Sequence, residues 1–464
     1  MISRPRDRSL ARRSAVAALI AAGLVAQLVL PGTATATNYR LFGPGPRYAA
    51  MAGAFTAVAD DFTGGYANPA AIIQKTSTRI GLGYQYAYMD LSADGEHDKR
   101  GEGTDGLYLG FVFTLPFIDW LKDRVAFGYN YFQPVDYVLS LQVPAATTPQ
   151  FVLLEQYPRA NVMHAAFASD PLPWLLLGFG ASFNADLGGG LDLKPGIRSL
   201  NGVSSILTTV DQESKSLFSP DAGAFVKGGE LTSGLDGWTF GFTWRYRYQV
   251  DLQIPLTILL SGIPLKLDFT STLLYTPETY TLGAAYHFGN HGEDGVVALD
   301  LAYNRYSRFE SPSLVIDTDI DIPILPLELK SGPAIDPRFH DTFTPRVGAD
   351  YRVFDGDSLE VWLRGGYAFD PSPAPQQTRT TNFLDGDKHI FGIGTGLAAK
   401  QLFGTDVSKS KPTFNLTFQT QLLSKVSAVK NADVPEQNPG WPDVRGHGTV
   451  YYLGAAISAD TSVP

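Results

Sequence analysis

The chain contains no cysteine among its 464 residues, which excludes disulfide bonds and thiolate metal sites. Charged residues are also scarce, at 18%, below the roughly 25% typical of soluble domains. Beyond the N-terminal segment, no stretch has the ~18 consecutive apolar residues of a membrane-spanning helix. Glycine (47), proline (31), tyrosine (22) and phenylalanine (28) are abundant instead. This composition favours strands joined by turns.

The sequence also lacks the usual catalytic and metal-binding motifs. It has no His-Glu-x-x-His, no aspartate-rich calcium loop and no Gly-x-Ser-x-Gly elbow, so it predicts no metal, no cofactor and no enzyme. An outer-membrane hydrolase would still need a Ser–His pair at one rim. Ser307 and His389 are the candidates for such a pair, but no sequence motif supports them. The glycine-rich run 392–396 lacks the lysine and helix of a phosphate loop, and small residues in a strand that faces a plug explain it better.

The first 36 residues have the pattern of a secretion signal. An apolar core, Ala15–Leu30, precedes the small-x-small site Ala34-Thr35-Ala36, so we expect cleavage near Ala36. The alternative is an uncleaved anchor, although the apolar run is shorter than the ~20 residues that span a bilayer. Removing the segment takes away five arginines and one aspartate, which changes the formal charge from −10 to −14. An acidic mature chain argues against nucleic acid as a partner.

Alternating apolar and polar residues run through most of the mature chain. In Thr239–Asp251, for example, the aromatic residues from Phe240 to Tyr248 occupy one face, and arginine, threonine and glutamine occupy the other. This alternation predicts a β-barrel with apolar residues outward and polar residues inward. A soluble sandwich alternates too, but paired charges of both signs suit a solvated lumen better than a dry core.

About fourteen segments show the pattern, and an even number of this size is typical of a bacterial outer-membrane barrel. We therefore predict an all-β transmembrane antiparallel barrel of about 14 strands. Its domains are a signal peptide (1–36), an N-terminal hatch or plug (37–75) and the barrel (76–464). The predicted strands are 80–91, 106–115, 124–137, 159–168, 175–187, 220–226, 239–251, 266–288 (joined as one strand), 297–303, 342–353, 359–369, 389–398, 413–422 and 448–457.

Two of the longer predicted connections are unusually apolar. One is Ile254–Leu265 and the other is Ile320–Leu329. On the outer rim of a barrel, an exposed apolar patch marks a binding surface, and the patch expected here contains Ile258, Leu259, Leu260 and Ile263. The alternative, equally weighted, is that these segments extend strands and pack on each other.

The stretch from Tyr48 to Ala71 differs from everything after it. It is rich in small residues, and Ala49–Val58 predicts two to three helical turns. Gly64 and Gly65 then loosen the backbone, and Asn68-Pro69 predicts a turn, because proline disfavours the helical conformation of the residue before it. The sequence thus predicts a compact segment that precedes a long β array.

This order resembles the FadL family of outer-membrane transporters for long-chain fatty acids and hydrocarbons, in which an N-terminal hatch with an Asn-Pro-Ala motif plugs a barrel. Here the motif is Asn68-Pro69-Ala70. The stretch 363–375 is similar to the family's late strand and Ser-Pro-x-Pro loop, and 384–394 is similar to the next strand start. The stretches 301–309 and 345–351 also resemble the family. One departure is the C-terminus, which ends at Pro464 where family members carry an aromatic that assists assembly.

The resemblance implies that a long-chain fatty acid, or another hydrophobic small molecule, passes passively above the hatch and leaves sideways into the outer membrane. Outer-membrane lipid and the barrel-assembly machinery are the other implied partners. The lateral gap would lie at a kinked strand, and Gly128 is the candidate for the kink. By strand parity, the arginines expected in the lumen as carboxylate ligands are Arg245, Arg247, Arg346 and Arg364. Pairing of these arginines with lumen carboxylates is the alternative. Neutral aromatic hydrocarbons as cargo, or a porin-like or structural barrel, are the alternative functions.

Overall fold

The structure is a computed structural model that describes residues 42–93, 102–115, 123–135, 146–155, 162–183, 218–260, 263–289, 292–309, 315–319 and 336–461. The predicted signal peptide, the apolar stretch Ile320–Leu329 and the C-terminal Pro464 lie outside these residues. The divisions at residues 36 and 75 therefore stay predictions. Among the described helices, none is both long enough and apolar enough to span a bilayer.

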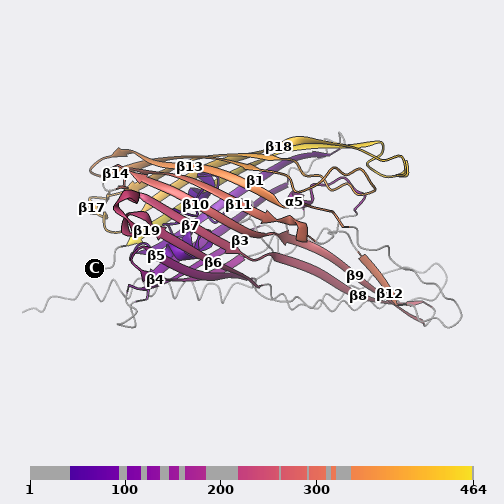
Figure 1. Cartoon of the computed structure of the whole chain (residues 1–464), viewed down its shortest axis with the longest axis horizontal. Coiled ribbons are helices and arrows are strands. Elements are labelled where there is room, and N and C mark those ends of the chain that lie inside the picture. The colour runs from indigo at the N-terminus through magenta and orange to yellow at the C-terminus, as the bar shows by residue number, and fades with distance from the viewer. Residues whose placement is uncertain are drawn as a thin grey trace, which may run out of the picture.

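Fourteen antiparallel strands close into a single barrel (Figure 1). Each predicted segment overlaps one barrel strand, so the predicted fold class is confirmed. The ring closes where β1 pairs with β19, from Thr78↔Thr461 to Ala93↔Gly446. In order around the ring, the strands are β1 (Thr78–Ala93), β19 (Asp443–Thr461), β18 (Thr413–Val429), β15 (Lys388–Ala399), β14 (Leu359–Asp370), β13 (Thr342–Asp355), β11 (Gly295–Arg305), β10 (Glu278–Phe288), β7 (Trp238–Arg245), β6 (Phe218–Lys227), β5 (Leu175–Phe183), β4 (Val162–Leu172), β3 (Val125–Pro134) and β2 (Glu102–Thr114).

The alternation along the strands places apolar side chains on the outside of the ring. Leu82, Leu299 and Ile393 are 56%, 57% and 62% exposed, whereas Asp350 and Thr417 on the inside are each 1% exposed. A soluble sandwich would show the reverse, with its aromatic and aliphatic rows buried against each other. The sandwich alternative is therefore wrong, and the exposed apolar band suits a lipid environment.

Residues 42–74, which we call the hatch, lie inside the ring (Figure 1). Their elements are α3 (Pro46–Ala50), α4 (Gly64–Ala67) and the 3₁₀ turn η1 (Pro69–Ile73). The predicted helix over Ala49–Val58 is wrong. Helix α3 ends at Ala50 because Ala52 and Gly53 adopt positive φ values of 48° and 80°, which no right-handed helix allows.

The chain between β7 and β10 forms a hairpin outside the barrel wall. Its strands are β8 (Tyr248–Leu260) and β9 (Ile263–Thr276), and β12 (Val315–Asp319) adds a third strand to this separate sheet. The predicted strand 239–251 is therefore interrupted at 246–247, and the joined strand 266–288 is interrupted at Pro277. The predicted connection Ile254–Leu265 is part of the hairpin, with the register Ile254↔Phe269 to Leu260↔Ile263, so the alternative that this segment extends strands is confirmed.

The two ends of the barrel differ in the length of their connections. Short turns join β4 to β5 and β13 to β14, whereas 184–217 and 306–341 connect strands at the opposite end. Barrels of this class have short periplasmic turns and long external loops, so the end with long connections is external. The β8–β9 hairpin extends beyond the external end (Figure 1). The remaining short elements are α5 (Val152–Glu155), α6 (Gly228–Leu231), η2 (Ser233–Leu235), η4 (Tyr306–Arg308), β16 (Gln401–Leu402) and β17 (Thr405–Asp406).

Candidate functional site

The hatch lies directly against the backbone of the wall, because wall glycines face it. A Cβ atom built on Gly366 would lie 2.2 Å from the carbonyl carbon of Met51, and one on Gly392 would lie 2.4 Å from the carbonyl oxygen of Ala49. No side chain fits at either position. The run 392–396 that we interpreted as strand glycines facing a plug is confirmed for Gly392 and Gly394. Other wall glycines that meet the hatch are Gly81, Gly110, Gly178, Gly223, Gly241, Gly283 and Gly348.

The Asn68-Pro69-Ala70 turn is bonded both to the hatch and to the wall. The fully buried Asn68 amide donates to the carbonyl of Thr56 at 2.9 Å and to the carbonyl of Ala224 in β6 at 3.2 Å. Its Oδ1 accepts the Ala70 N–H at 3.1 Å and so caps η1. Each of these amide groups would be costly to bury without a partner. Asn68 therefore fixes the turn against β5 and β6, where Gly178 and Gly223 make room for it.

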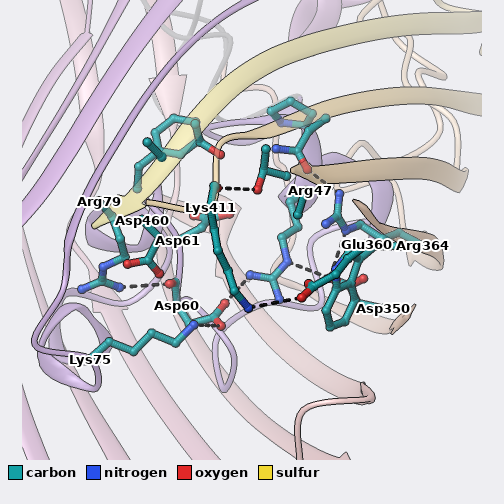
Figure 2. A pocket seen from close by; sticks show the side chains of 18 residues that line it. Arg47, Asp60, Asp61, Lys75, Arg79, Asp350, Glu360, Arg364, Lys411 and Asp460 are labelled. Atoms are coloured by element: carbon teal, nitrogen blue, oxygen red, sulfur yellow. Dashed lines mark hydrogen bonds and ion pairs between the residues drawn. The ribbon is translucent and has the colours of Figure 1, made fainter. Parts of the chain in front are cut away.

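Ion pairs hold the first part of the hatch at its periplasmic side (Figure 2). Arg47 bridges the hatch carboxylate of Asp60 and the wall carboxylate of Asp350, whose Oδ2 is 2.8 Å from the Arg47 Nε. Arg364 shares Asp350 at 2.9 Å, and Lys75 reaches Asp60 at 2.8 Å. These charges border a cavity of about 210 Å³ below the hatch.

The protonation of Asp60 follows from this arrangement. Burial alone would raise the pKa of Asp60, but the charges of Arg47 and Lys75, with hydrogen bonds from both, hold it well below its usual range. The carboxylate is therefore ionised at neutral pH and pairs with both cations. Because Arg47 links a hatch residue to a wall residue, the ion pairs contribute to the position of the hatch.

A second cavity lies between the hatch and the external end. Phe42, Gly43 and Tyr48 of the hatch form one side of it, and Leu153 and Leu154 form the opposite side. The wall contributes mainly polar groups, namely Thr344, Arg346, Asp370, Lys388, Gln419 and Gln421. About 60 Å³ of this cavity is accessible to water. The site combines apolar surfaces with a few polar groups, which is typical of a pocket for an amphipathic or apolar molecule.

The segment that carries Leu153 and Leu154 was missed in the sequence. Residues 146–154, which we call the inserted segment, lie between β3 and β4 in the chain and fold over the hatch. Their alternation is too short to indicate a strand and no cap marks the single turn of α5. The apolar run Phe151–Leu154 is the only signal that this connection is buried.

Comparison with known protein families gives a match over about a third of the chain. The family described as outer membrane protein transport protein (OMPP1/FadL/TodX) matches residues 269–429. The resemblance to the FadL-type family is confirmed. This match and the closed barrel with its apolar outer band place the chain in the outer membrane, and the matched family is described as one of transport proteins. The search of curated protein sequences finds no significant match.

Solved structures agree with the fold of this barrel. A FadL homologue from Pseudomonas aeruginosa is 16% identical, with a TM-score of 0.53 over 93% of this chain and 98% of that one. The CymD monoaromatic hydrocarbon channel is 16% identical, with a TM-score of 0.54 over 91% and 99%. The Ralstonia pickettii toluene transporter TbuX is 16% identical, with a TM-score of 0.50 over 91% and 100%. At this identity the likeness establishes the fold.

The four candidate arginines of the lumen have different surroundings. Arg245 donates to the Tyr66 carbonyl and lies 3.5 Å from Asp221, with its guanidinium 3.9 Å from the Tyr66 ring centroid. Arg364 donates to Asp350 and, at 2.6 Å, to the Oδ1 of Asn415. Both are therefore engaged by structural partners.

Arg247 and Arg346 differ from this pair. Arg247 lies in the break between β7 and β8, so strand parity does not place it in the lumen, and its guanidinium lies 6.0 Å from the Tyr246 ring. Arg346 in β13 lines the cavity above the hatch and donates one long hydrogen bond, 3.5 Å, to the Gly53 carbonyl. Within the part of the chain that the structure describes, no carboxylate lies within 4.0 Å of Arg346.

The remaining predicted site residues have the following positions. Gly128 faces the hatch, where a Cβ would lie 3.4 Å from the Ile72 side chain, and β3 pairs with β2 and β4 without a register shift. The Asn68 turn lies against β5 and β6 instead, so a gate at Gly128 stays a prediction. The residues of the apolar patch, Ile258, Leu259, Leu260 and Ile263, lie at the tip of the β8–β9 hairpin.

Proposed function

We propose that this barrel takes up hydrophobic small molecules across the outer membrane by passive passage around the hatch, with lateral exit into the membrane. The observation that carries the proposal is the cavity above the hatch, which has apolar surfaces from the hatch and the inserted segment and lies inside a lipid-exposed barrel. Transfer of hydrocarbon out of water supplies ~0.8 kcal/mol per CH₂ group, so the passage needs no energy coupling.

Long-chain fatty acids are our first candidate cargo, because Arg346 lines this cavity without a carboxylate in contact among the described residues. A guanidinium binds a carboxylate through charge-assisted hydrogen bonds. Arg245 and Arg364 support the proposal less well, since their donors already serve the hatch and the wall. Neutral aromatic hydrocarbons are the second candidate, favoured by the likeness in fold to TbuX and CymD.

A competition assay separates the two cargoes. Purified protein is incubated with labelled oleate, and unlabelled toluene is added as the competitor. For a fatty acid transporter we expect Arg346→Ala to weaken oleate binding roughly tenfold, because about one hydrogen bond to a charged group is lost. Toluene binding should be unaffected. Arg124→Ala is the control, because this exposed arginine pairs with Asp170 at the periplasmic end. Toluene binding that persists while oleate fails to bind would identify the hydrocarbon as cargo.

Ion conductance in planar bilayers tests the transporter against a porin. The intact protein should conduct poorly, because the hatch fills the lumen, and deletion of residues 38–71 should open the pore. Conductance of an open pore by the intact protein, or failure of both ligands to bind, would return the barrel to a porin-like or structural role.

A further inference from the structure

The inserted segment, residues 146–154, is buried between the hatch and the external end. Phe151 and Leu154 are 1% and 2% exposed and pack in one apolar cluster with Phe42 of the hatch and Tyr452 of β19. Val152 and Leu153 belong to a second cluster on the other side, which contains Tyr306, Phe309, Phe339 and Phe383. The segment thus lies across the outer lumen between these two apolar clusters.

Its hydrogen bonds to other described parts of the chain include a group that joins it to the loop after β14. Gln150 donates its N–H to the Asn382 carbonyl at 3.1 Å, and its own carbonyl accepts the Leu384 N–H at 2.7 Å. Asn382 also donates its N–H to the Ala146 carbonyl at 2.9 Å and its side-chain amide to the Thr147 carbonyl at 2.6 Å. The isolated bridge Gln150↔Phe383 pairs the segment with this loop, whereas each wall strand has a ladder of pairs on both sides.

The cavity below the segment is too small for a ligand in this structure. Its 60 Å³ has room for a few water molecules, because one water needs ~10–15 Å³ of such volume. Pockets that bind small molecules measure about 300–1,000 Å³. Leu153 and Leu154 form its outer side, so a molecule from outside cannot occupy it while they remain in place.

We propose that residues 146–154 form an outer lid, hinged against the loop 382–384, which must lift before a molecule from outside reaches the cavity above the hatch. Hydrogen bonds to the loop 382–384 and apolar packing hold the lid, and the described structure shows no strand ladder between it and the wall. The lid and the hatch then form two separate barriers, one on each side of the cavity.

The absence of cysteine makes the lid testable with a single introduced thiol. Ile390 lines the cavity, so Ile390→Cys reports on access to it. A charged, water-soluble methanethiosulfonate reagent added from outside should label this thiol slowly. Thr148→Cys is the matched control, because Thr148 is the exposed residue of the lid itself and should label rapidly.

Weakening the hinge should increase access. Asn382→Ala removes the side-chain bonds to Thr147 and to the Asn438 Oδ1, the latter at 3.1 Å. Loss of the one side-chain hydrogen bond to the lid should raise the labelling rate of Ile390→Cys about fivefold and leave that of Thr148→Cys unchanged.

Locking the lid should have the opposite effect. Residues paired across a bridge lie within disulfide reach, so Gln150→Cys with Phe383→Cys should form a bond on oxidation. Labelling of Ile390→Cys should stop when the bond forms and return on reduction, and Phe383→Ala controls for the lost ring. The proposal is overturned if Ile390→Cys labels as fast as Thr148→Cys in the parent chain, or if the disulfide leaves its labelling unchanged. Neither labelling result depends on which cargo the barrel transports.

Discussion

At the scale of single residues, the close contact between hatch and wall depends on wall glycines, which have no side chain. At Gly366 the hatch backbone occupies the space where a Cβ would lie, so Gly366→Ala must displace either β14 or Met51. Overpacking of this kind costs about 1–3 kcal/mol. We expect this variant to conduct ions above the parent level in planar bilayers, because the hatch no longer fits closely.

The adjacent glycine provides the control. A Cβ on Gly365 would meet only the Gly392 carbonyl oxygen at 4.0 Å, an ordinary contact. Gly365→Ala should therefore behave like the parent chain. Equal conductance of both variants would contradict the close fit.

Asp60 gives the hatch a pH dependence whose sign follows from its lowered pKa. A carboxyl whose pKa is lower in the folded state stabilises that state above its unfolded pKa, near 3.9, and loses the effect as pH falls through the folded value. Conductance should stay low from neutral pH to about pH 5 and rise only in stronger acid. Asp60→Asn should raise conductance already at pH 7. An Asn variant that matches the parent at pH 7 would show that the ion pairs do not hold the hatch.

Residue-level features were only partly predictable from the sequence. Strand parity correctly placed Arg346 and Arg364 in the lumen, because alternation fixes the face of a residue in a continuous strand. At Arg247 the break at 246–247 interrupts the strand, so parity does not apply there and its place in the lumen stays a prediction. No local pattern shows that Arg364 is bound by Asp350 and Asn415, since those partners come from other strands.

At the scale of elements, the β8–β9 hairpin is outside the closed ring. Strand β7 pairs directly with β10, from Arg245↔Thr279 to Trp238↔Tyr286, so the wall is complete without residues 246–277. We expect a variant in which a short turn replaces these residues to fold into a barrel that keeps its heat-modifiable migration on gels.

Removal of an equally long segment, residues 278–309, is the control. This deletion takes away β10 and β11, which are wall strands, and should abolish the folded band. Loss of the folded band in the hairpin variant as well would show that the hairpin is needed to form the wall.

The elements of the wall were predictable, whereas those inside and outside it were not. Alternation over about ten residues identified each barrel strand, because one face contacts lipid and the other the lumen. The hairpin has the same alternation, so the sequence could not separate it from the wall. The hatch could not be predicted in detail, because the positive φ of Ala52 is imposed by packing inside the ring and not by local propensity.

At the scale of the whole molecule, the outward apolar band defines the surface that contacts the membrane. Leu299 lies in the middle of β11 and is 57% exposed, so Leu299→Arg would place a charge in lipid. The expected loss of stability is about 2–4 kcal/mol for arginine at the bilayer midplane, measured by denaturant unfolding in vesicles. Phe403→Arg is the control, because this fully exposed residue lies in a periplasmic turn. Equal stability of the two variants would contradict the membrane position.

The close approach between the wall glycines and the hatch also constrains assembly. Glycines from strands all round the ring touch the hatch backbone, and Asn68 is bonded to both the hatch and β6. A finished cylinder offers no route for so tightly enclosed an object to be inserted afterwards. We therefore expect the strands to wrap around a hatch that is already folded, with β1 and β19 the last pair to join. Biogenesis of this barrel would then begin with folding of the hatch and end with pairing of β1 and β19.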